Sequence, residues 1–141
     1  MLRRPALVLV FAAASLCGCG ELKRECRAVV ATANAFIAES GKGKPSAHGP
    51  EATAREARAL AERYDKLATD LGALSVKSEE LAGDVEAYRK LAVSAATSLR
   101  GAATALEQKD WETARKRRVE FDEAARGEAP LVARINAVCR G

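Results

Sequence analysis

The chain has few of the residues on which most protein chemistry depends. Its 141 residues include one histidine, one tryptophan and one methionine, and aromatic residues make up only 4%. A single histidine, His48, excludes the paired Glu-x-x-His motifs of a di-iron bundle, and methionine is absent after Met1, so a b-type haem lacks its usual ligands. The shortage of aromatic and β-branched residues also argues against an all-β domain. At this length the chain fits one domain.

Recognisable catalytic motifs are absent as well. The sequence has no glycine-rich phosphate loop, no Gly-x-Ser-x-Gly elbow and no Cys-x-x-Cys-His haem motif. His48 lies in a Gly/Pro-rich stretch, and its nearest acid, Glu51, is not at a catalytic spacing. Adjacent carboxylates such as Glu79 and Glu80 do not converge on one point of a helix. We therefore expect a non-enzymatic protein with no catalytic, cofactor-binding or metal site.

The first twenty residues, MLRRPALVLVFAAASLCGCG, have the pattern of an export signal. Arg3 and Arg4 supply a positive start, and residues 5–16 form a run of apolar and small residues. About a dozen such residues are too few to cross a bilayer core, which needs roughly 20.

Leu16-Cys17-Gly18-Cys19 resembles the lipobox of small bacterial lipoproteins, here of an uncharacterised helical-bundle type. The resemblance implies cleavage after residue 18, acyl chains on Cys19, and a lipid-anchored domain over residues 19–141. Two or three acyl chains would hold that domain on a membrane, and Gly20 after the cysteine implies the outer membrane, facing the periplasm or the surface. A plain secretory signal or an uncleaved anchor is the alternative.

Processing of this kind leaves two cysteines, Cys26 and Cys139. Cys17 leaves with the signal and Cys19 becomes a thioether, so a metal site lacks enough ligands. Two cysteines in an oxidising envelope usually pair, and we expect a Cys26–Cys139 disulfide. Loss of Arg3 and Arg4 also lowers the net charge from +4 to +2.

Apolar residues at steps of three and four predict four helices, at about residues 21–40, 51–71, 79–107 and 111–140. We expect Ser78 and Asp110 to cap the third and fourth helices. In the fourth, Arg118 and Glu128 interrupt the apolar stripe, with the stem of Arg118 packed and its head turned outward. Gly127 and Pro130 predict a kink or short break there.

Four amphipathic segments with at least two short connections predict an all-α, up-down-up-down antiparallel four-helix bundle. In that topology the start of the first helix lies beside the end of the fourth. Cys26 and Cys139 occupy those two ends, so the disulfide and the topology support each other.

The sequence Arg115-Lys116-Arg117-Arg118 is the one conspicuous run of charge. Export argues against a nucleic-acid partner, and four consecutive residues point in every direction around a helix. A solvated helix face is the simplest interpretation. The functional alternative is a contact with anionic lipid headgroups or lipopolysaccharide phosphates near the anchor.

Together these patterns predict a cell-envelope lipoprotein without a cofactor. Its expected partners are the membrane, reached through the acyl chains, and another envelope protein, for which it serves as a structural or interaction module. The alternative is a binding protein that holds an apolar or lipid ligand within the bundle.

Overall fold

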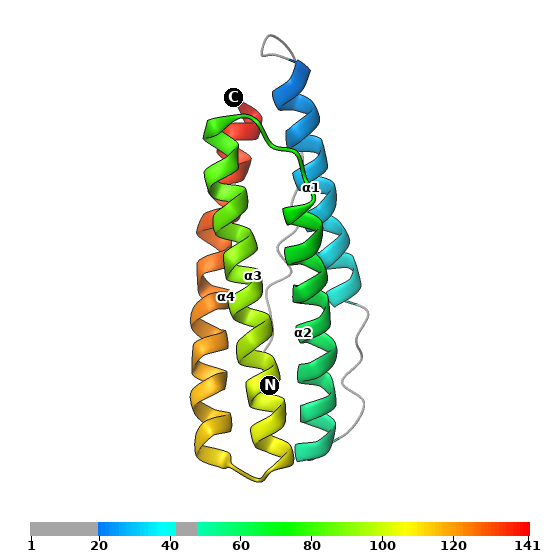
Figure 1. The fold of residues 1–141 in the computed structure, drawn as a ribbon, viewed down its shortest axis with the longest axis vertical. Helices are drawn as coiled ribbons and strands as arrows, with labels where there is room; N and C mark the ends of the chain where they lie inside the picture. Colours follow the sequence, from blue (N-terminus) through cyan, green and yellow to red (C-terminus); the bar gives the residue numbers. More distant parts are fainter. Residues whose placement is uncertain (1–19, 42–47) are drawn as a thin grey trace.

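The computed structural model describes residues 20–41 and 48–141, and these residues form four α-helices. The helices stand side by side and alternate in direction (Figure 1), which confirms the predicted up-down-up-down antiparallel bundle. Their bounds are α1, Gly20–Ser40; α2, Pro50–Gly72; α3, Glu79–Glu107; and α4, Trp111–Arg140. The predicted export signal and Cys19 lie outside the described residues.

The two ends of the bundle differ in what they contain. The disulfide end holds the start of α1, the α2–α3 loop and the end of α4, whereas the turn end holds the α3–α4 connection at residues 108–110 (Figure 1). With 21 residues, α1 is shorter than α3 and α4, and in Figure 1 it accompanies only the half of the bundle nearest the disulfide end. The turn end is therefore built from α2, α3 and α4.

Small side chains let the helices approach closely. On α3, Ala92, Ala95, Ala96 and Ala103 are fully buried, and α3 packs closely against both α2 and α4. Larger side chains complete the core, where the ring of Tyr64 lies 4.7 Å from that of Phe36 and 6.0 Å from that of Phe121. These three rings join α1, α2 and α4 across the interior.

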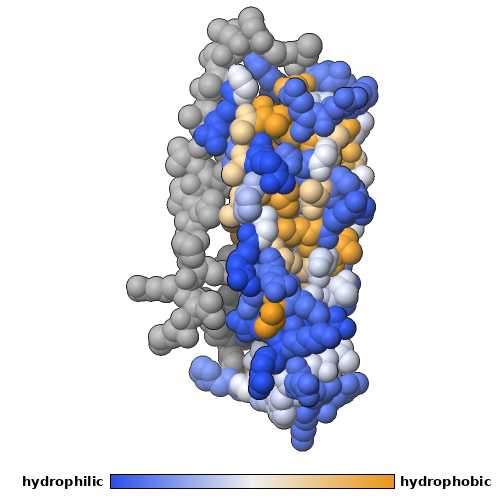
Figure 2. All heavy atoms as spheres, turned by 90° about the vertical axis from the view of Figure 1, so that its left-hand side faces the viewer, coloured by the Kyte–Doolittle hydropathy of each residue, from blue (hydrophilic) through white to orange (hydrophobic). Residues whose placement is uncertain are grey.

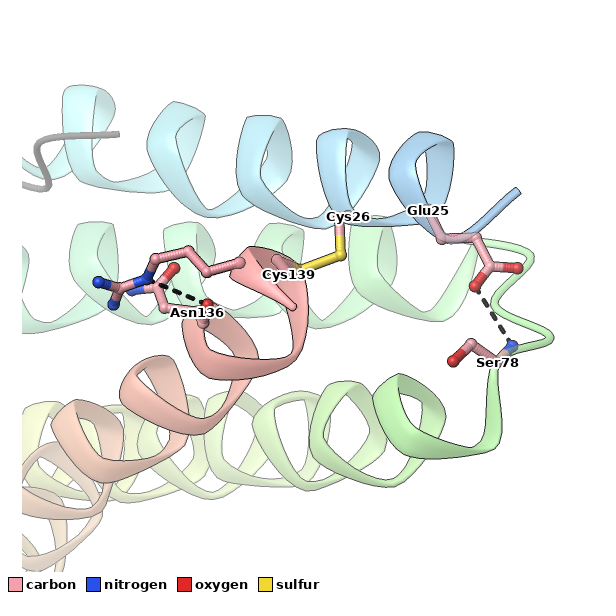
Figure 3. Close-up of a disulfide and its surroundings, with 6 residues drawn as sticks. Glu25, Cys26, Ser78, Asn136 and Cys139 are labelled. Atoms are coloured by element: carbon pink, nitrogen blue, oxygen red, sulfur yellow. Dashed lines mark hydrogen bonds between the residues drawn. A yellow bond between two sulfur atoms is a disulfide. The ribbon is translucent and has the colours of Figure 1, made fainter. Parts of the chain in front are cut away.

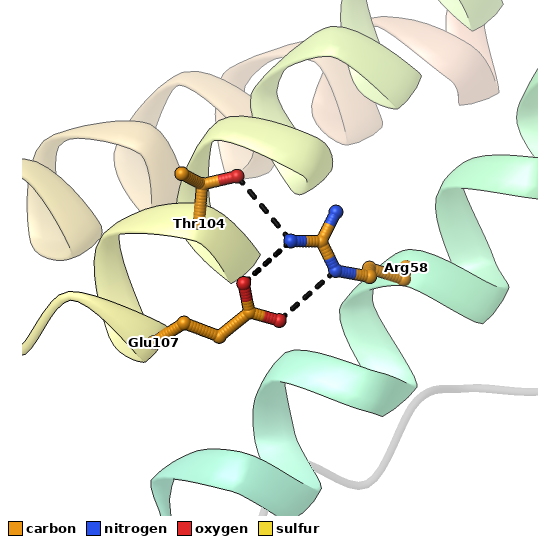
Figure 4. Close-up of polar contacts among 3 residues, drawn as sticks. All are labelled: Arg58, Thr104 and Glu107. Carbon is orange, nitrogen blue, oxygen red and sulfur yellow. Dashed lines mark hydrogen bonds and ion pairs between the residues drawn. The ribbon is translucent and has the colours of Figure 1, made fainter.

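An exposed polar contact links α2 to α3 near the turn end. The guanidinium of Arg58 donates to both carboxylate oxygens of Glu107, at 3.1 and 2.6 Å, and to the hydroxyl of Thr104 at 3.4 Å (Figure 4). The hydrogen bond from Arg58 lowers the pKa of the Glu107 carboxyl. Both side chains are exposed, so water and salt screen the pair and it adds little to stability.

Of the two predicted forms, a kink or a short break, the break does not occur, because α4 runs through Pro130 as one helix of 30 residues. Pro130 has no N–H group to donate to the carbonyl of Arg126 one turn earlier. Both residues are exposed, so water can donate to that carbonyl instead. Gly127, the other residue expected to break the helix, faces α3. A Cβ added at position 127 would lie 3.3 Å from a methyl carbon of Leu91. The glycine therefore serves close packing of α4 on α3.

Candidate functional site at the disulfide end

A disulfide joins the first helix to the last. The structure places Cys26 of α1 and Cys139 of α4 in bonding position, with their Cα atoms 5.6 Å apart (Figure 3). Cys26 is buried and belongs to the hydrophobic core. This is the pairing that the sequence predicted, and it closes the ring of helices across 113 residues of sequence.

A buried carboxylate from α1 caps the start of α3. Glu25 is only 7% exposed, and its oxygens accept hydrogen bonds from the backbone N–H groups of Lys77, at 2.8 Å, and Ser78, at 3.2 Å (Figure 3). Ser78 occupies the predicted N-cap position, but its side chain makes no capping hydrogen bond, so that part of the prediction is wrong. A negative charge beside a helix N-terminus is favourable because the helix dipole is positive there.

The remaining residues in the first turns of α1 are also attached to the bundle. Glu21 forms an ion pair with Lys77 at 3.2 Å, and Leu22 packs against the core. The Arg24 guanidinium donates to the carbonyl of Gly20 at 3.2 Å. The hydrogen bond from Arg24 lies within α1 itself, so the contacts that attach the first turn to the rest of the bundle are those of Glu21 and Leu22.

The basic run lies at the other end of the molecule. Arg115 to Arg118 lie in the second turn of α4. At 1.5 Å per residue, the run is about 33 Å along the helix from Cys139. Arg117 pairs with Glu120 at 2.9 Å, and Arg118 pairs with Asp122 at 3.3 Å. Arg115 and Lys116 are exposed. The four side chains therefore do not form one patch, and the run is not near Gly20.

The predicted placement of Arg118 is wrong by one residue. Arg118 is exposed, while Arg117 is half-buried and its stem crosses Gly101 of α3. A Cβ at position 101 would lie 3.0 Å from Cδ and Nε of Arg117, so the glycine makes room for the arginine. Arg117 fills the position between Ala114 and Phe121, both of which are buried.

The other predicted interruption, Glu128, has a partner in the core. Tyr88 of α3 is 1% exposed, and its hydroxyl donates to Oε1 of Glu128 at 2.7 Å. Burial, with the nearby charge of Glu128, raises the pKa of Tyr88 well above its usual value. The only signal of this contact in the sequence was the position of Glu128, a charged residue on the apolar stripe of the fourth helix.

Among the hollows between helices in the described part of the chain, two differ sharply in character. The first is an apolar crevice between α1 and α4, over Tyr88, with a volume of about 20 Å³; its lining includes Val29, Ala33, Val132 and Ile135. That volume admits about one water molecule. The second is an open polar groove of about 530 Å³ between α3 and α4; its lining includes Ser94, Ser98, Arg117, Glu120 and Glu123.

No metal centre was found in the described part of the chain, which holds no group of three or more His, Cys, Asp or Glu residues able to bind an ion. His48 is exposed just before α2. Over residues 20–41 and 48–141, none of the helices combines the length and hydrophobicity needed to span a bilayer.

Fold and disulfide thus define the class: an all-α, four-helix bundle closed between its first and last helices. Comparison with family models, with curated proteins and with solved structures gives no match.

Proposed function

We propose that the chain is a non-enzymatic lipoprotein of the bacterial cell envelope, held by acyl chains on Cys19 and acting as a structural or protein-interaction module. The outer membrane is the proposed location, from Gly20 at the position after the modified cysteine. A disulfide between Cys26 and Cys139 is consistent with an oxidising compartment.

The observation that carries the proposal is the place of the lipobox relative to the fold. Cleavage after residue 18 would leave all four described helices whole, since the described part of α1 is Gly20–Ser40. The bundle would therefore keep its core and its disulfide after processing. Cys26 and Cys139 are engaged with each other, which leaves Cys19 as the cysteine available for acylation in the processed chain.

Metabolic labelling with a fatty acid, followed by mass spectrometry of the purified protein, tests the anchor. Cys19→Ala should abolish labelling and processing, whereas the matched control Cys17→Ala should keep both because position 17 leaves with the signal. Labelling that survives Cys19→Ala, or that is lost only in Cys17→Ala, would refute the assignment.

Exposed apolar side chains support a role in protein interaction. Val93 of α3 is 42% exposed and Val119 of α4 is 49% exposed. Figure 2 shows apolar atoms gathered over the middle and upper part of one long face, between hydrophilic flanks. Such surface is costly to leave in water, so an envelope protein that covers it is the proposed partner.

In-cell photo-crosslinking tests the interaction role. A photoreactive residue at Val93 or Val119 should give a discrete adduct, identified by mass spectrometry. The control is Glu62, an exposed position on α2, which should give none. Equal crosslinking from all three positions would show non-specific contact and count against a defined interface.

The second candidate, a binding protein for an apolar or lipid ligand, is favoured by the apolar crevice between α1 and α4. At about 20 Å³ the crevice is far too small for an acyl chain, so α1 would have to move away from α4. Native mass spectrometry tests this candidate: a co-purifying lipid supports it, and an unliganded mass argues against it.

A further inference from the structure

We infer that the disulfide end of the bundle faces the phospholipid bilayer and that the bundle stands upright on it, with the turn end held away from the lipid. The inference rests on the proposed acylation of Cys19. It assigns an interaction surface, which consists of the first turn of α1, the α2–α3 loop and the last turn of α4, and a partner, which is the headgroup layer.

The first argument is the absence of a spacer between the anchor and the fold. Cys19 is bonded to Gly20, so their Cα atoms are about 3.8 Å apart, and Gly20 is already the first residue of α1. For comparison, a flexible linker of ten residues would separate its ends by about 17 Å on average. The anchor is thus attached directly to a helix.

The second argument is that this helix cannot swing independently of the bundle. Glu21 pairs with Lys77 of the α2–α3 loop, Glu25 holds the start of α3, and Cys26 is joined to α4. Within two turns of the anchor, these contacts link the start of α1 to α4 and to the loop that leads into α3. The anchor at residue 19 is therefore rigidly coupled to the bundle, so the position of the anchor sets the orientation of the bundle.

The charges of the disulfide end neither attract nor repel a bilayer strongly. The exposed cations there are nearly balanced by carboxylates: five cations, Lys23, Arg24, Arg27, Lys77 and Arg140, stand against the exposed Glu21, Glu79 and Glu80 and the buried Glu25. The acyl chains supply the binding, and the covalent geometry supplies the orientation.

The length of the bundle then separates the basic run from the lipid. From Gly20 back to Cys26 and along α4 to Trp111 the axial distance is about 50 Å at 1.5 Å per residue. Charges are screened beyond about 8 Å at physiological ionic strength. Arg115 and Lys116 would therefore be unable to contact headgroups of the bilayer that holds the anchor, which argues against the alternative interpretation of the basic run and leaves the solvated helix face.

The protein carries its own reporter for this geometry. Trp111 is the only tryptophan, it is 51% exposed, and it begins α4 at the turn end. The acylated protein would be placed in phosphatidylethanolamine and phosphatidylglycerol vesicles, with and without a nitroxide on the headgroups. Such a label quenches only an indole that lies near the headgroups. The expected change in Trp111 emission is less than one tenth.

A matched variant moves the reporter to the other end. Trp111→Phe combined with Lys23→Trp places the indole at an exposed position in the first turn of α1, and its emission should fall at least two-fold with the same label. A twelve-residue Gly/Ser linker inserted between Cys19 and Gly20 of this variant should reduce that quenching. If the linker leaves the quenching unchanged, the direct attachment of Cys19 to α1 does not set the orientation, and the first argument is refuted.

Other outcomes separate this inference from the proposed function. If the protein does not float with vesicles or lacks the acyl mass, the proposed anchor is wrong. If it floats and Trp111 is quenched as strongly as the indole at position 23, the anchor stands and the upright orientation is wrong. Relief of that quenching by Arg115→Ala and Lys116→Ala would identify the basic run as the headgroup contact instead.

Discussion

Replacing Glu25 tests whether a side chain from α1, rather than the local N-cap residue, stabilises the start of α3. The carboxylate accepts two backbone N–H groups at 2.8 and 3.2 Å and is 7% exposed. In Glu25→Ala both donors lose this partner at a part-buried site. The control is Ser78→Ala, because Ser78 holds the N-cap position but its side chain makes no capping hydrogen bond.

The expected magnitudes differ clearly. A hydrogen bond to a charged group contributes about 1.5–3 kcal/mol, and loss of a charge at the helix N-terminus adds a few tenths. The two donors lie at a part-buried site where water can replace part of what is lost, so Glu25→Ala should lower the free energy of unfolding by about the value of one such bond, about 2–3 kcal/mol, or about 6–12 °C in Tm for a domain of this size. Ser78→Ala should cost less than about 0.5 kcal/mol, as for surface changes away from such contacts.

Urea titration of the oxidised protein, followed by circular dichroism, measures both variants, and the slopes against urea should match the wild type. Glu25→Gln adds a further check, since its amide oxygen keeps an acceptor without the charge and should fall between alanine and the wild type. A loss above 1 kcal/mol in Ser78→Ala together with no loss in Glu25→Ala would refute the assignment of the cap.

Three other predictions concern stability. Cys139→Ser, which frees Cys26, should lower the free energy of unfolding by up to about 4–5 kcal/mol for a closed loop of this length; an unchanged urea midpoint would contradict it. Because burial raises the pKa of Tyr88, the wild type should lose stability as pH rises above about 10, where tyrosines of the unfolded chain ionise first. Tyr88→Phe should reduce this alkaline loss, and an identical pH dependence would count against burial as the cause. Gly83→Ala should add about 0.5–1 kcal/mol because nothing lies near its Cβ, while Gly101→Ala should gain less because its Cβ would meet a side chain at 3.0 Å; equal gains would be inconsistent with that close approach.

The positions of the helices could be predicted from the sequence, because a helix repeats every 3.6 residues and its buried face needs apolar residues at that period. The stripes through Leu67 and Leu71, and through Leu81, Val85 and Tyr88, fall on residues that the structure buries. The start of α4 could also be predicted from the local sequence. Asp110 accepts a hydrogen bond from the N–H of Thr113 at 3.0 Å, as expected of an N-cap residue.

The sequence failed where the deciding partner belonged to another helix. Nothing near Ser78 indicates that Glu25, more than fifty residues earlier, accepts the backbone N–H groups of Lys77 and Ser78 just before α3. Likewise, the break expected at Pro130 does not occur. Local propensity is a weak guide at such positions because packing against neighbouring helices provides most of a helix's stability.

By itself, the sequence determined the number and approximate bounds of the helices and their antiparallel order, because periodicity and loop length are properties of the chain. That order also placed Cys26 and Cys139 at the same end of the bundle, which favoured their pairing. Only the tertiary structure decided which polar groups meet in the interior and which end of the bundle each surface feature occupies. It showed that Glu25 holds α3 and that Glu128 accepts from Tyr88. These contacts depend on how side chains far apart in sequence are brought together, and that is decided when the four helices pack.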